Sequence, residues 1–342
     1  MSKLTSYLES NGYVKTALLV SEIIPNPWFK RLKDISYLAT FRFAFDNSVE
    51  FTRYQHSIKT AYYLSRLMIE NHIEEEIGIK VILQGLLHDI GHIFFSHIGE
   101  RILRKSENFN HEEYGDIIIN ENFYSVFKIH NIHLPLIKEI PNQYKILLNS
   151  HIDLDTLQGI TKTAKLLKIK KIDLEKLIMN MHYSENTKIW HINNTFYKEI
   201  LNFWKLKRII YQNYVYSIKN QFIEYLMMKY ISRIKNLSKI LIESKIINSL
   251  KNNINFMNEL NKLNSLKDED VTKINLKKTE KFNTDMNILE NLGIDISNKN
   301  YIISKVKIFK NPGLIKIPRS LTDLNDFLGV HYHKEKRLYI FT

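Results

Sequence analysis

The stretch Gly85–Glu100, which reads GLLHDIGHIFFSHIGE, constrains this chain most because it places ionisable side chains among apolar ones. It holds three histidines and two carboxylates within what reads as one apolar helix and turn. A buried charge without a partner costs several kcal/mol or becomes neutralised. Imidazole nitrogen and carboxylate oxygen together suit a divalent first-row metal ion. The segment therefore predicts a metal centre, and with it an enzyme.

The spacing of apolar residues predicts an all-α fold. Up to about residue 235 they recur at helical intervals, and glycine and proline are scarce. We expect helices at Pro27–Leu38, Thr52–Met68, Ile77–Ile90, Phe94–Lys105, His111–Ile119, Pro135–Lys168 with a break near Asn149, Leu174–Asn180 and Phe196–Lys235. The alternation of polar and apolar residues at Lys188–Ile192 predicts one short strand.

The chain changes character near Asn236, where a helical run rich in lysine, asparagine and leucine begins. Beyond Gly293 three segments read as strands, namely Tyr301–Phe309, Leu314–Ile317 and Arg337–Phe341. We therefore expect a helical domain over residues 1–235. Residues 236–342 should add a helical segment and a small mixed α/β appendage.

Composition narrows the classes of protein and of site. The chain has no cysteine, so disulfides and thiolate metal ligands are excluded, and a metal must be held by His, Asp and Glu. No apolar run reaches the roughly 20 residues of a bilayer span, and the N-terminus lacks the pattern of a signal peptide. We expect a cytoplasmic protein with no membrane partner. The net charge of +13 would suit nucleic acid, but the lysines are spread along the chain, so nucleic acid stays a secondary prediction.

The ligand set can be extended from ligand type and helix placement. His88 and Asp89 are adjacent, so on a helix their side chains point about 100° apart and share an ion only over the seam between their faces. His56 lies on the preceding long helix, and Asp155 is the best further ligand from a later one. Two nitrogens and two oxygens leave positions open for water and a phosphate oxygen. Each residue alone could be an ordinary core or surface residue, so the prediction depends on the four together.

Four motifs resemble those of the HD superfamily of metal-dependent phosphohydrolases. They are RYQHS at Arg53–Ser57, LLHDIGHIFFSH at Leu86–His97, NHEEYG at Asn110–Gly115 and IDLDTL at Ile152–Leu157. More narrowly, they resemble its deoxynucleoside triphosphate triphosphohydrolase branch, which includes the dGTPase-like and the SAM-and-HD-domain proteins. The lead-in segment Asn26–Leu38 and the later helices also follow that branch, so the likeness covers about the first two thirds of the chain.

The resemblance implies a role for each matching residue. It assigns the metal to His56, His88, Asp89 and Asp155, with Asp153 as the rival for the last position. The family's polar cluster beside the metal corresponds to His92, His97, Glu100 and His111. Within it, His92 or His111 would be the general acid, and Glu100 or Glu112 would fix the tautomer of the imidazole. A helix-capping or core role is the alternative for His97 and His111.

The resemblance also implies how phosphate and sugar are bound. The residues that match its phosphate and substrate ligands are Arg53, Arg208, Tyr216 and Lys219. Arginine suits such places because its planar fork grips two phosphate oxygens. Tyr37 stands where the branch has a glutamine that reads the sugar 3′-hydroxyl. Further departures follow the D-x-D, where the chain has Thr156, Gln158–Gly159 and Lys162–Thr163 instead of the branch's Lys, D-Y and R-D.

We therefore expect an HD-domain helical core that hydrolyses (deoxy)nucleoside triphosphates to nucleoside and triphosphate by metal-activated water. One divalent ion, Mn, Fe, Ni, Zn or Mg, would be the cofactor, and a second Mg could accompany the substrate phosphates. An HD phosphodiesterase or nuclease acting on cyclic or signalling nucleotides or on single-stranded nucleic acid is one alternative. A catalytically silent nucleotide-binding regulator is another. The resemblance further implies a homo-oligomer.

Overall fold

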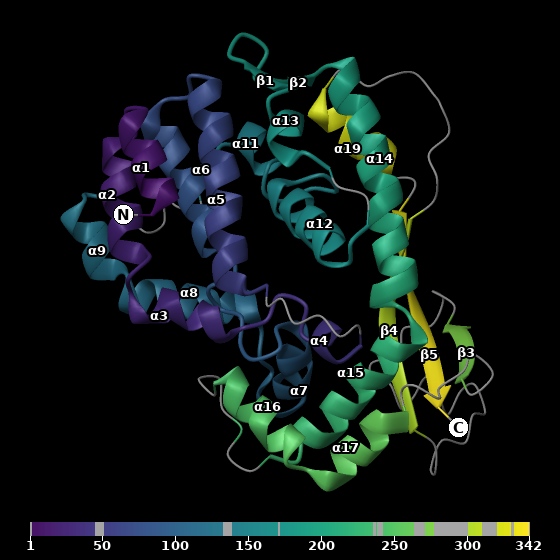
Figure 1. The fold of residues 1–342 in the computed structure, drawn as a ribbon. Coiled ribbons are helices and arrows are strands. Elements are labelled where there is room, and N and C mark those ends of the chain that lie inside the picture. Colours follow the sequence, from purple (N-terminus) through teal and green to yellow (C-terminus); the bar gives the residue numbers. More distant parts are fainter. Residues whose placement is uncertain are drawn as a thin grey trace.

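The computed structural model describes residues 2–44, 51–132, 139–169, 172–234, 237, 242–262, 271–276, 300–309, 320–329 and 332–341. Helices make up most of this part, which confirms the all-α prediction. In Figure 1, α5 and α6 run side by side, α12 lies in the middle of the molecule and α14 lies across from them. A small sheet packs near the lower end of α14, so the predicted mixed appendage is present too.

The elements up to residue 231 include nearly all of the helices that form the core. The first group is α1 (Lys3–Ser10), α2 (Val14–Ile23), α3 (Pro27–Lys30), η1 (Arg31–Asp34), α4 (Phe41–Ala44), α5 (Arg53–Glu70), α6 (Glu75–Leu87), α7 (His97–Glu107), α8 (His111–Asn122) and α9 (Tyr124–Ile129). The second group is α11 (Asn142–Lys145), α12 (Leu154–Leu166), α13 (Leu174–Ile178), β1 (Met181–Ser184), β2 (Ile189–Ile192), α14 (Asn194–Ile210), the π-helix η2 (Tyr211–Val215) and α15 (Ile218–Ile231). The predicted short strand is thus confirmed as β2, and β1 pairs with it in an antiparallel hairpin.

Two predicted helices are shorter than the apolar spacing indicated. The helix predicted at Pro27–Leu38 ends at Asp34, since Ile35 turns to an extended conformation. Its carbonyl then accepts from the N–H of Arg53 at 2.9 Å. The helix predicted at Phe94–Lys105 begins only at His97, because Phe95 and Ser96 have φ values of 52° and 50°.

Two longer predictions are interrupted. The break expected near Asn149 is confirmed, because α11 ends at Lys145 and α12 begins only at Leu154. The start of that helix, Pro135, falls outside the described residues. The single helix predicted at Phe196–Lys235 is wrong, since η2 and a new N-cap at Ser217 divide it. The side chain of Ser217 accepts from the N–H of Asn220 and so starts α15.

The C-terminal elements are α16 (Glu243–Lys251), α17 (Ile254–Asn261), β3 (Val271–Leu276), β4 (Asn300–Phe309), α19 (Leu321–Gly329) and β5 (Tyr332–Phe341). The strands form an antiparallel sheet in the order β3–β5–β4, in which Lys307 pairs with Lys334 and Phe309 with Tyr332. The strands predicted at Tyr301–Phe309 and Arg337–Phe341 are confirmed, and β5 is longer. β3 was not predicted, and Leu314–Ile317 lies outside the described residues.

The buried apolar side chains form two clusters. The first joins α1 to α3, η1, α5, α6 and the helices from α8 to α14, and Leu321, Leu324 and Leu328 of α19 belong to it as well. The second joins α4, α7, α15, α16 and α17. Elements from both sides of residue 235 therefore pack together, and the domain division at that residue stays a prediction. Within the described ranges, no helix is both long and apolar enough to cross a bilayer.

Candidate metal centre

Four side chains from three separate segments converge between α5, α6 and α12. His56 lies in the first turn of α5, His88 and Asp89 directly follow α6, and Asp155 lies in the first turn of α12. Nε2 of His56 lies 2.5 Å from Oδ1 of Asp155 and 3.8 Å from Oδ2 of Asp89. Nε2 of His88 lies 3.4 Å from Oδ1 of Asp89 and 3.6 Å from Oδ1 of Asp155. The structure thus brings together all four residues that the sequence predicts as metal ligands.

Both histidines are oriented so that Nε2 faces the carboxylates. Nδ1 of His56 bonds the side-chain oxygen of Gln158, and Nδ1 of His88 lies 2.9 Å from the carbonyl oxygen of Gly85. Because these oxygens only accept, each Nδ1 carries a proton, so Nε2 is the nitrogen that a metal ion would bind in place of a proton. Nε2 of His88 is buried and has no hydrogen-bond partner among the described residues. This donor set and the orphaned nitrogen fit a divalent metal ion.

The electrostatics of the centre favour a cation. Burial alone would raise the pKa of Asp89, but the guanidinium of Arg53 and the nearby imidazoles hold it well below its usual range. Nη1 of Arg53 lies 3.0 and 2.9 Å from the two carboxylate oxygens of Asp89. Burial also lowers the pKa of His88, yet the charges of Asp89 and Asp155 raise it to about 9. The carboxylates thus hold a proton on His88 where a metal ion would supply the positive charge.

The positions of Asp153 and Asp155, the two acids of the D-x-D, agree with the choice of Asp155 as the metal ligand. Asp153 is the N-cap of α12, and its carboxylate accepts from the N–H of Thr156 at 2.6 Å and of Ser150 at 3.2 Å. Burial and the charge of Asp155 raise the pKa of Asp153 to about 6. Asp155 instead contacts both histidines, and its side chain is 39% exposed. Asp153 therefore starts the helix, while Asp155 faces the centre.

A buried carboxylate that sequence reasoning missed supports the centre from far along the chain. Glu243, 2% exposed, accepts from the N–H of Ser36 at 3.1 Å and of Phe95 at 2.7 Å, and from the hydroxyl of Ser36. The carbonyl of Ser36 accepts from Ser96 Oγ at 2.7 Å, and that hydroxyl accepts from Nε of Arg53 at 3.0 Å. Glu243 thus fixes the guanidinium that pairs with Asp89. No local signal in the sequence indicates this.

A second polar cluster lies beside the centre. Nε2 of His92 lies 3.2 Å from Oδ1 of Asp89, and its ring stacks on that of His111 with centroids 4.2 Å apart and planes at 9°. Nδ1 of His111 lies 2.9 Å from Oε2 of Glu100, which also pairs with Arg104. The predicted cluster is therefore assembled, and Glu100 is the acid that fixes the tautomer of His111.

The outer members of the cluster differ in exposure. The side chain of His97 is 67% exposed, and its Nδ1 lies 3.4 Å from Glu100. Glu112 is exposed in the first turn of α8, and no described contact joins its carboxylate to an imidazole, as the alternative would require. One ring nitrogen from each of His92, His97 and His111 lies within 4.8 Å of the other two. An ion lies in the plane of each imidazole that binds it, so the parallel rings of His92 and His111 cannot share one.

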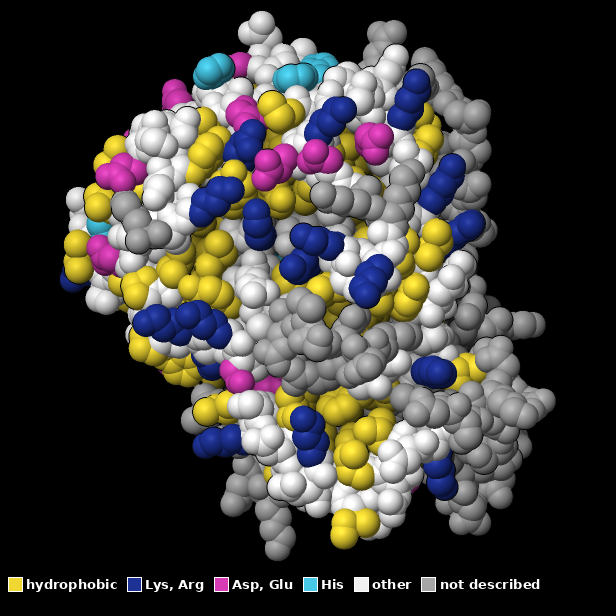
Figure 2. All heavy atoms as spheres, in the orientation of Figure 1, with side chains coloured by type: hydrophobic (Ala, Val, Ile, Leu, Met, Phe, Trp, Pro, Cys, Tyr) yellow, Lys and Arg dark blue, Asp and Glu magenta, His cyan; other side chains and the backbone are white. Residues whose placement is uncertain are grey.

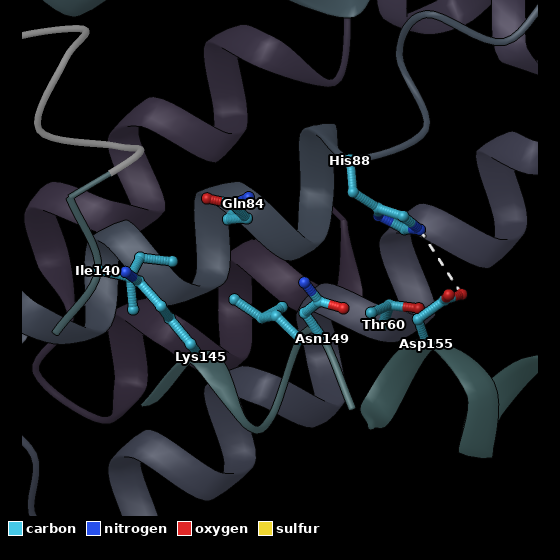
Figure 3. A pocket seen from close by; sticks show the side chains of 8 residues that line it. Thr60, Gln84, His88, Ile140, Lys145, Asn149 and Asp155 are labelled. Atoms are coloured by element: carbon cyan, nitrogen blue, oxygen red, sulfur yellow. Dashed lines mark ion pairs between the residues drawn. The ribbon is translucent and has the colours of Figure 1, made fainter. Parts of the chain in front are cut away.

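A pocket of about 260 Å³ opens beside the centre. Its walls are Thr60, Gln84, His88, Ile140, Lys145, Leu148, Asn149 and Asp155. Figure 3 shows His88 and Asp155 facing each other at one end, while Ile140 and Lys145 lie at the other. The volume is near the lower end of the roughly 300–1,000 Å³ of small-molecule sites. Two of the predicted ligands are thus accessible to a small molecule.

Tyr37 and Gly159, two positions that differ from the triphosphohydrolase branch, lie against each other, and the absent side chain of Gly159 makes room for the Tyr37 ring. The ring of Tyr37 lies 4.5 Å from that of His56, and the guanidinium carbon of Arg53 lies 4.5 Å from its centroid. A Cβ atom on Gly159 would come within 2.0 Å of the Tyr37 hydroxyl oxygen. Only glycine at position 159 therefore admits this tyrosine. Its ring covers one side of His56, where the branch has its sugar-reading glutamine.

The other predicted phosphate ligands lie on or after α14. Nε of Arg208 is buried and makes no hydrogen bond within the described residues. The hydroxyl of Tyr216 accepts from the N–H of Lys307 at 2.8 Å. Lys219 is exposed in the first turn of α15. None of the three has a described contact with the four converging side chains.

Lys207, which sequence reasoning passed over, contacts the segment that leads into α12. It is 7% exposed, and its Nζ lies 3.3 Å from the carbonyl oxygen of His151. Burial and the charge of Lys307 lower its pKa to about 8, while Asp153 and Asp155 oppose that change.

On the face shown in Figure 2, Lys and Arg side chains are scattered and form no continuous stripe.

Comparison with known proteins agrees with this geometry. Residues 53–212 match the model of the family described as HD domain. An uncharacterized protein of Mycoplasma pneumoniae is 28% identical over 243 residues, which cover 63% of this chain and 56% of the relative. A protein of Dictyostelium discoideum named deoxynucleoside triphosphate triphosphohydrolase SAMHD1 homolog is 28% identical over 120 residues, 32% of this chain and 23% of the relative. The chain spans about half or less of the length of these relatives.

Two solved structures share the fold. A hypothetical protein from Aquifex aeolicus superposes with a TM-score of 0.66 at 16% identity, covering 94% of this chain and 92% of its own. A phosphohydrolase from Bacteroides thetaiotaomicron superposes with a TM-score of 0.63 at 17% identity, covering 94% and 95%. At such identities the likeness concerns the fold alone.

Proposed function

We propose that the protein is a metal-dependent phosphohydrolase, because residues 53–212 match the family model of the HD domain. The observation that carries the proposal is the convergence of His56, His88, Asp89 and Asp155, with one buried imidazole nitrogen left without a partner. A divalent ion held there would act as a Lewis acid that activates water and neutralises phosphoryl charge.

The surrounding side chains have separate tasks in this proposal. Arg53 uses Nε and Nη1 for Ser96 and Asp89, which leaves Nη2 for a phosphate oxygen. Burial keeps the pKa of His92 well below its usual value, so His92 is neutral and donates from Nε2 to Asp89. His111 instead hydrogen-bonds Glu100 through Nδ1 at 2.9 Å, which leaves its Nε2 for the leaving oxygen. We therefore assign the general acid to His111 rather than to His92.

We propose a (deoxy)nucleoside triphosphate as the substrate, with nucleoside and triphosphate as the products. The Dictyostelium relative bears the name of such an enzyme, and cations from α5 and α14 flank the centre. Tyr37 favours an altered sugar pocket, because it blocks the place of the glutamine on which the branch relies. Phosphodiesterase or nuclease activity is therefore the second candidate, and a silent nucleotide-binding regulator is the third.

The proposal also includes one divalent ion, which is Mn, Fe, Ni, Zn or Mg, and a second Mg bound with the substrate. It further includes a homo-oligomer and a cytoplasmic location. Nucleic acid as a partner belongs to the second candidate only.

The test uses Asp155→Asn. Asp89→Ala would leave the buried guanidinium of Arg53 without its partner, which costs about 3–5 kcal/mol and threatens the fold. Asp155 is 39% exposed on the pocket, so Asp155→Asn removes a charge with little effect on packing. Asp173→Asn is the matched control, since Asp173 is the N-cap of α13 and asparagine caps equally well.

The assay incubates Mn-loaded protein with dNTPs, NTPs, cyclic nucleotides and short oligonucleotides and identifies the products by mass. Release of intact triphosphate that is lost in Asp155→Asn and kept in Asp173→Asn supports the proposal. Cleavage of diesters alone supports the second candidate instead. A protein that binds nucleotide but hydrolyses none of the panel is a regulator, and the enzyme proposal then fails.

A further inference from the structure

The pocket beside the metal centre carries polar side chains to which the proposed hydrolysis assigns no task. Helical spacing places two of them next to metal ligands, since residues four apart lie on one face of a helix. Thr60 lies one turn beyond His56 in α5, and Gln84 lies one turn before His88 in α6. Both line the pocket, and Figure 3 shows them between its two ends, together with Asn149.

These three side chains have hydrogen-bonding groups that the described residues do not pair. Thr60 is 1% exposed, and its Oγ1 is buried without a hydrogen-bond partner within the described ranges. The side-chain amides of Gln84 and Asn149 make no hydrogen bond to a described residue either. Buried polar groups are normally paired, and Gln84 is the single polar residue in the apolar run Val81–Leu87. The pocket thus presents free donors and acceptors to a molecule that enters it.

The lining suits an uncharged ring better than a phosphate chain. Ile140 and Leu148 supply apolar surface, and the exposed Lys145 is the one lysine or arginine among the described lining residues. Pockets for ring compounds combine apolar walls with a few placed polar groups in this way. An amide side chain holds one donor and one acceptor side by side, the arrangement that pairs with an edge of adenine. Gln84 and Asn149 therefore fit a nucleobase.

The size and position of the pocket agree with a base. A cavity of about 150 Å³ is large enough to bind benzene, so the pocket of about 260 Å³ has room for a purine ring and part of a sugar. His88 and Asp155 form its end at the metal centre. The ring of Tyr37, 4.5 Å from that of His56, covers another side of the centre. A nucleotide whose base lies in the pocket therefore places its phosphate at the metal ligands.

We propose that this pocket binds the nucleobase of the substrate, and that the amides of Gln84 and Asn149 hydrogen-bond its edge, with adenine as the base that they fit. The inference rests on the proposed function, because it places the part of a nucleotide that lies next to the reacting phosphate. Thr60, which lies beside Asp155 in Figure 3, supplies a hydrogen bond at the sugar end of the pocket. The name base pocket is used for this site below.

The experiment measures the binding of deoxyadenosine to Mn-loaded protein by calorimetry. This nucleoside has no phosphoester bond, so the protein cannot hydrolyse it. Gln84→Met keeps the length of the side chain and removes the amide, so the affinity should fall about tenfold. Gln143→Met is the matched control, because Gln143 is also a half-buried helical glutamine but is not among the described lining residues. It should change the affinity less than twofold, and thermal melts check that each variant is folded.

Thr60→Val tests the hydroxyl separately. Valine keeps the shape and removes a buried polar group that lacks a partner, so the free protein should melt at the same temperature or higher. The affinity for deoxyadenosine should nevertheless fall about fivefold. Thr161→Val is the matched control, since Thr161 Oγ1 is likewise buried and unpaired among the described residues but lies outside the described lining. A lower melting temperature with unchanged affinity would remove Thr60 from the base pocket.

The outcomes separate the base pocket from the proposed function. Failure of deoxyadenosine to bind saturably would overturn the base pocket, and so would equal losses in Gln84→Met and Gln143→Met. An equal loss of tripolyphosphate affinity in Gln84→Met would mean that a phosphate chain occupies the pocket instead. Hydrolysis of dATP with a KM unchanged in Gln84→Met keeps the function and rejects the base pocket. Deoxyadenosine binding that depends on Gln84, in a protein that hydrolyses no nucleotide, keeps the base pocket and rejects the function.

Discussion

The backbone of α8 lies close to Gly91 near the metal centre, and replacing this glycine gives a sharp prediction. Gly91 lies in the turn between Asp89 and His92 and packs against the start of α8. A Cβ atom at this position would come within 1.9 Å of the carbonyl oxygen of His111 and 2.4 Å of the nitrogen of Gly115. Both are backbone atoms, so no side-chain rotation relieves the clash.

The cost of Gly91→Ala follows from these distances. A contact of 3.0 Å requires α8 to move by about 1 Å, and overpacking of this kind costs about 1–3 kcal/mol or more. We expect about 3 kcal/mol, which lowers Tm by roughly 4 °C in a chain of 342 residues. The shift also separates His111 from His92, whose rings stack with centroids 4.2 Å apart. A misplacement of about 1 Å in a catalytic group costs about 10²-fold in rate.

Thermal melts and kcat on the substrate found in the nucleotide panel measure the two effects. Gly115→Ala is the control from the opposite side of the same contact, since its Cβ atom would meet nothing nearer than 3.4 Å. Because Gly115 lies within α8, alanine there should leave the stability unchanged or raise it by up to about 1 kcal/mol. If Gly91→Ala melts like the wild type and keeps its kcat, the tight contact and the role of His111 are both refuted.

Two further predictions concern the ion and its surroundings. Glu243→Gln places an amide N–H against backbone N–H groups and should weaken Mn²⁺ binding about tenfold in calorimetry. The control Glu259→Gln, which removes the ion pair with Lys229 and the hydrogen bond from Tyr230, should leave Mn²⁺ affinity unchanged. Equal losses in both variants would contradict the role of Glu243 in fixing Arg53. Mn²⁺ at 100 times its Kd should stabilise EDTA-treated protein by about 2.7 kcal/mol, and an unchanged melt argues against the site.

The sequence could predict the centre because its main determinants are local. His88 and Asp89 follow a helix that is apolar on most sides, and His56 lies on a helix whose flank packs against it. Helical spacing then limits which residues can meet. The choice of Asp155 over Asp153 also has a local cause, since an Asp followed by a helix tends to cap it. Glu243 has no such signal, because its partners Ser36 and Phe95 are distant in the chain and are chosen by packing.

The end of α14 shows what a regular helical period misses. The apolar spacing predicts one continuous helix over Phe196–Lys235, and the resemblance assigns Arg208, Tyr216 and Lys219 along it to phosphate. The turn Tyr211–Val215 is instead π-helical, with i→i+5 hydrogen bonds that take in about one extra residue. One extra residue changes the direction of the side chains that follow by about 100°, so Tyr216 and Lys219 do not project relative to Arg208 as a continuous α-helix would place them. Polar residues such as Gln212 and Asn213 fit an α-helix equally well, and only the packing of β4 on this turn distinguishes the two.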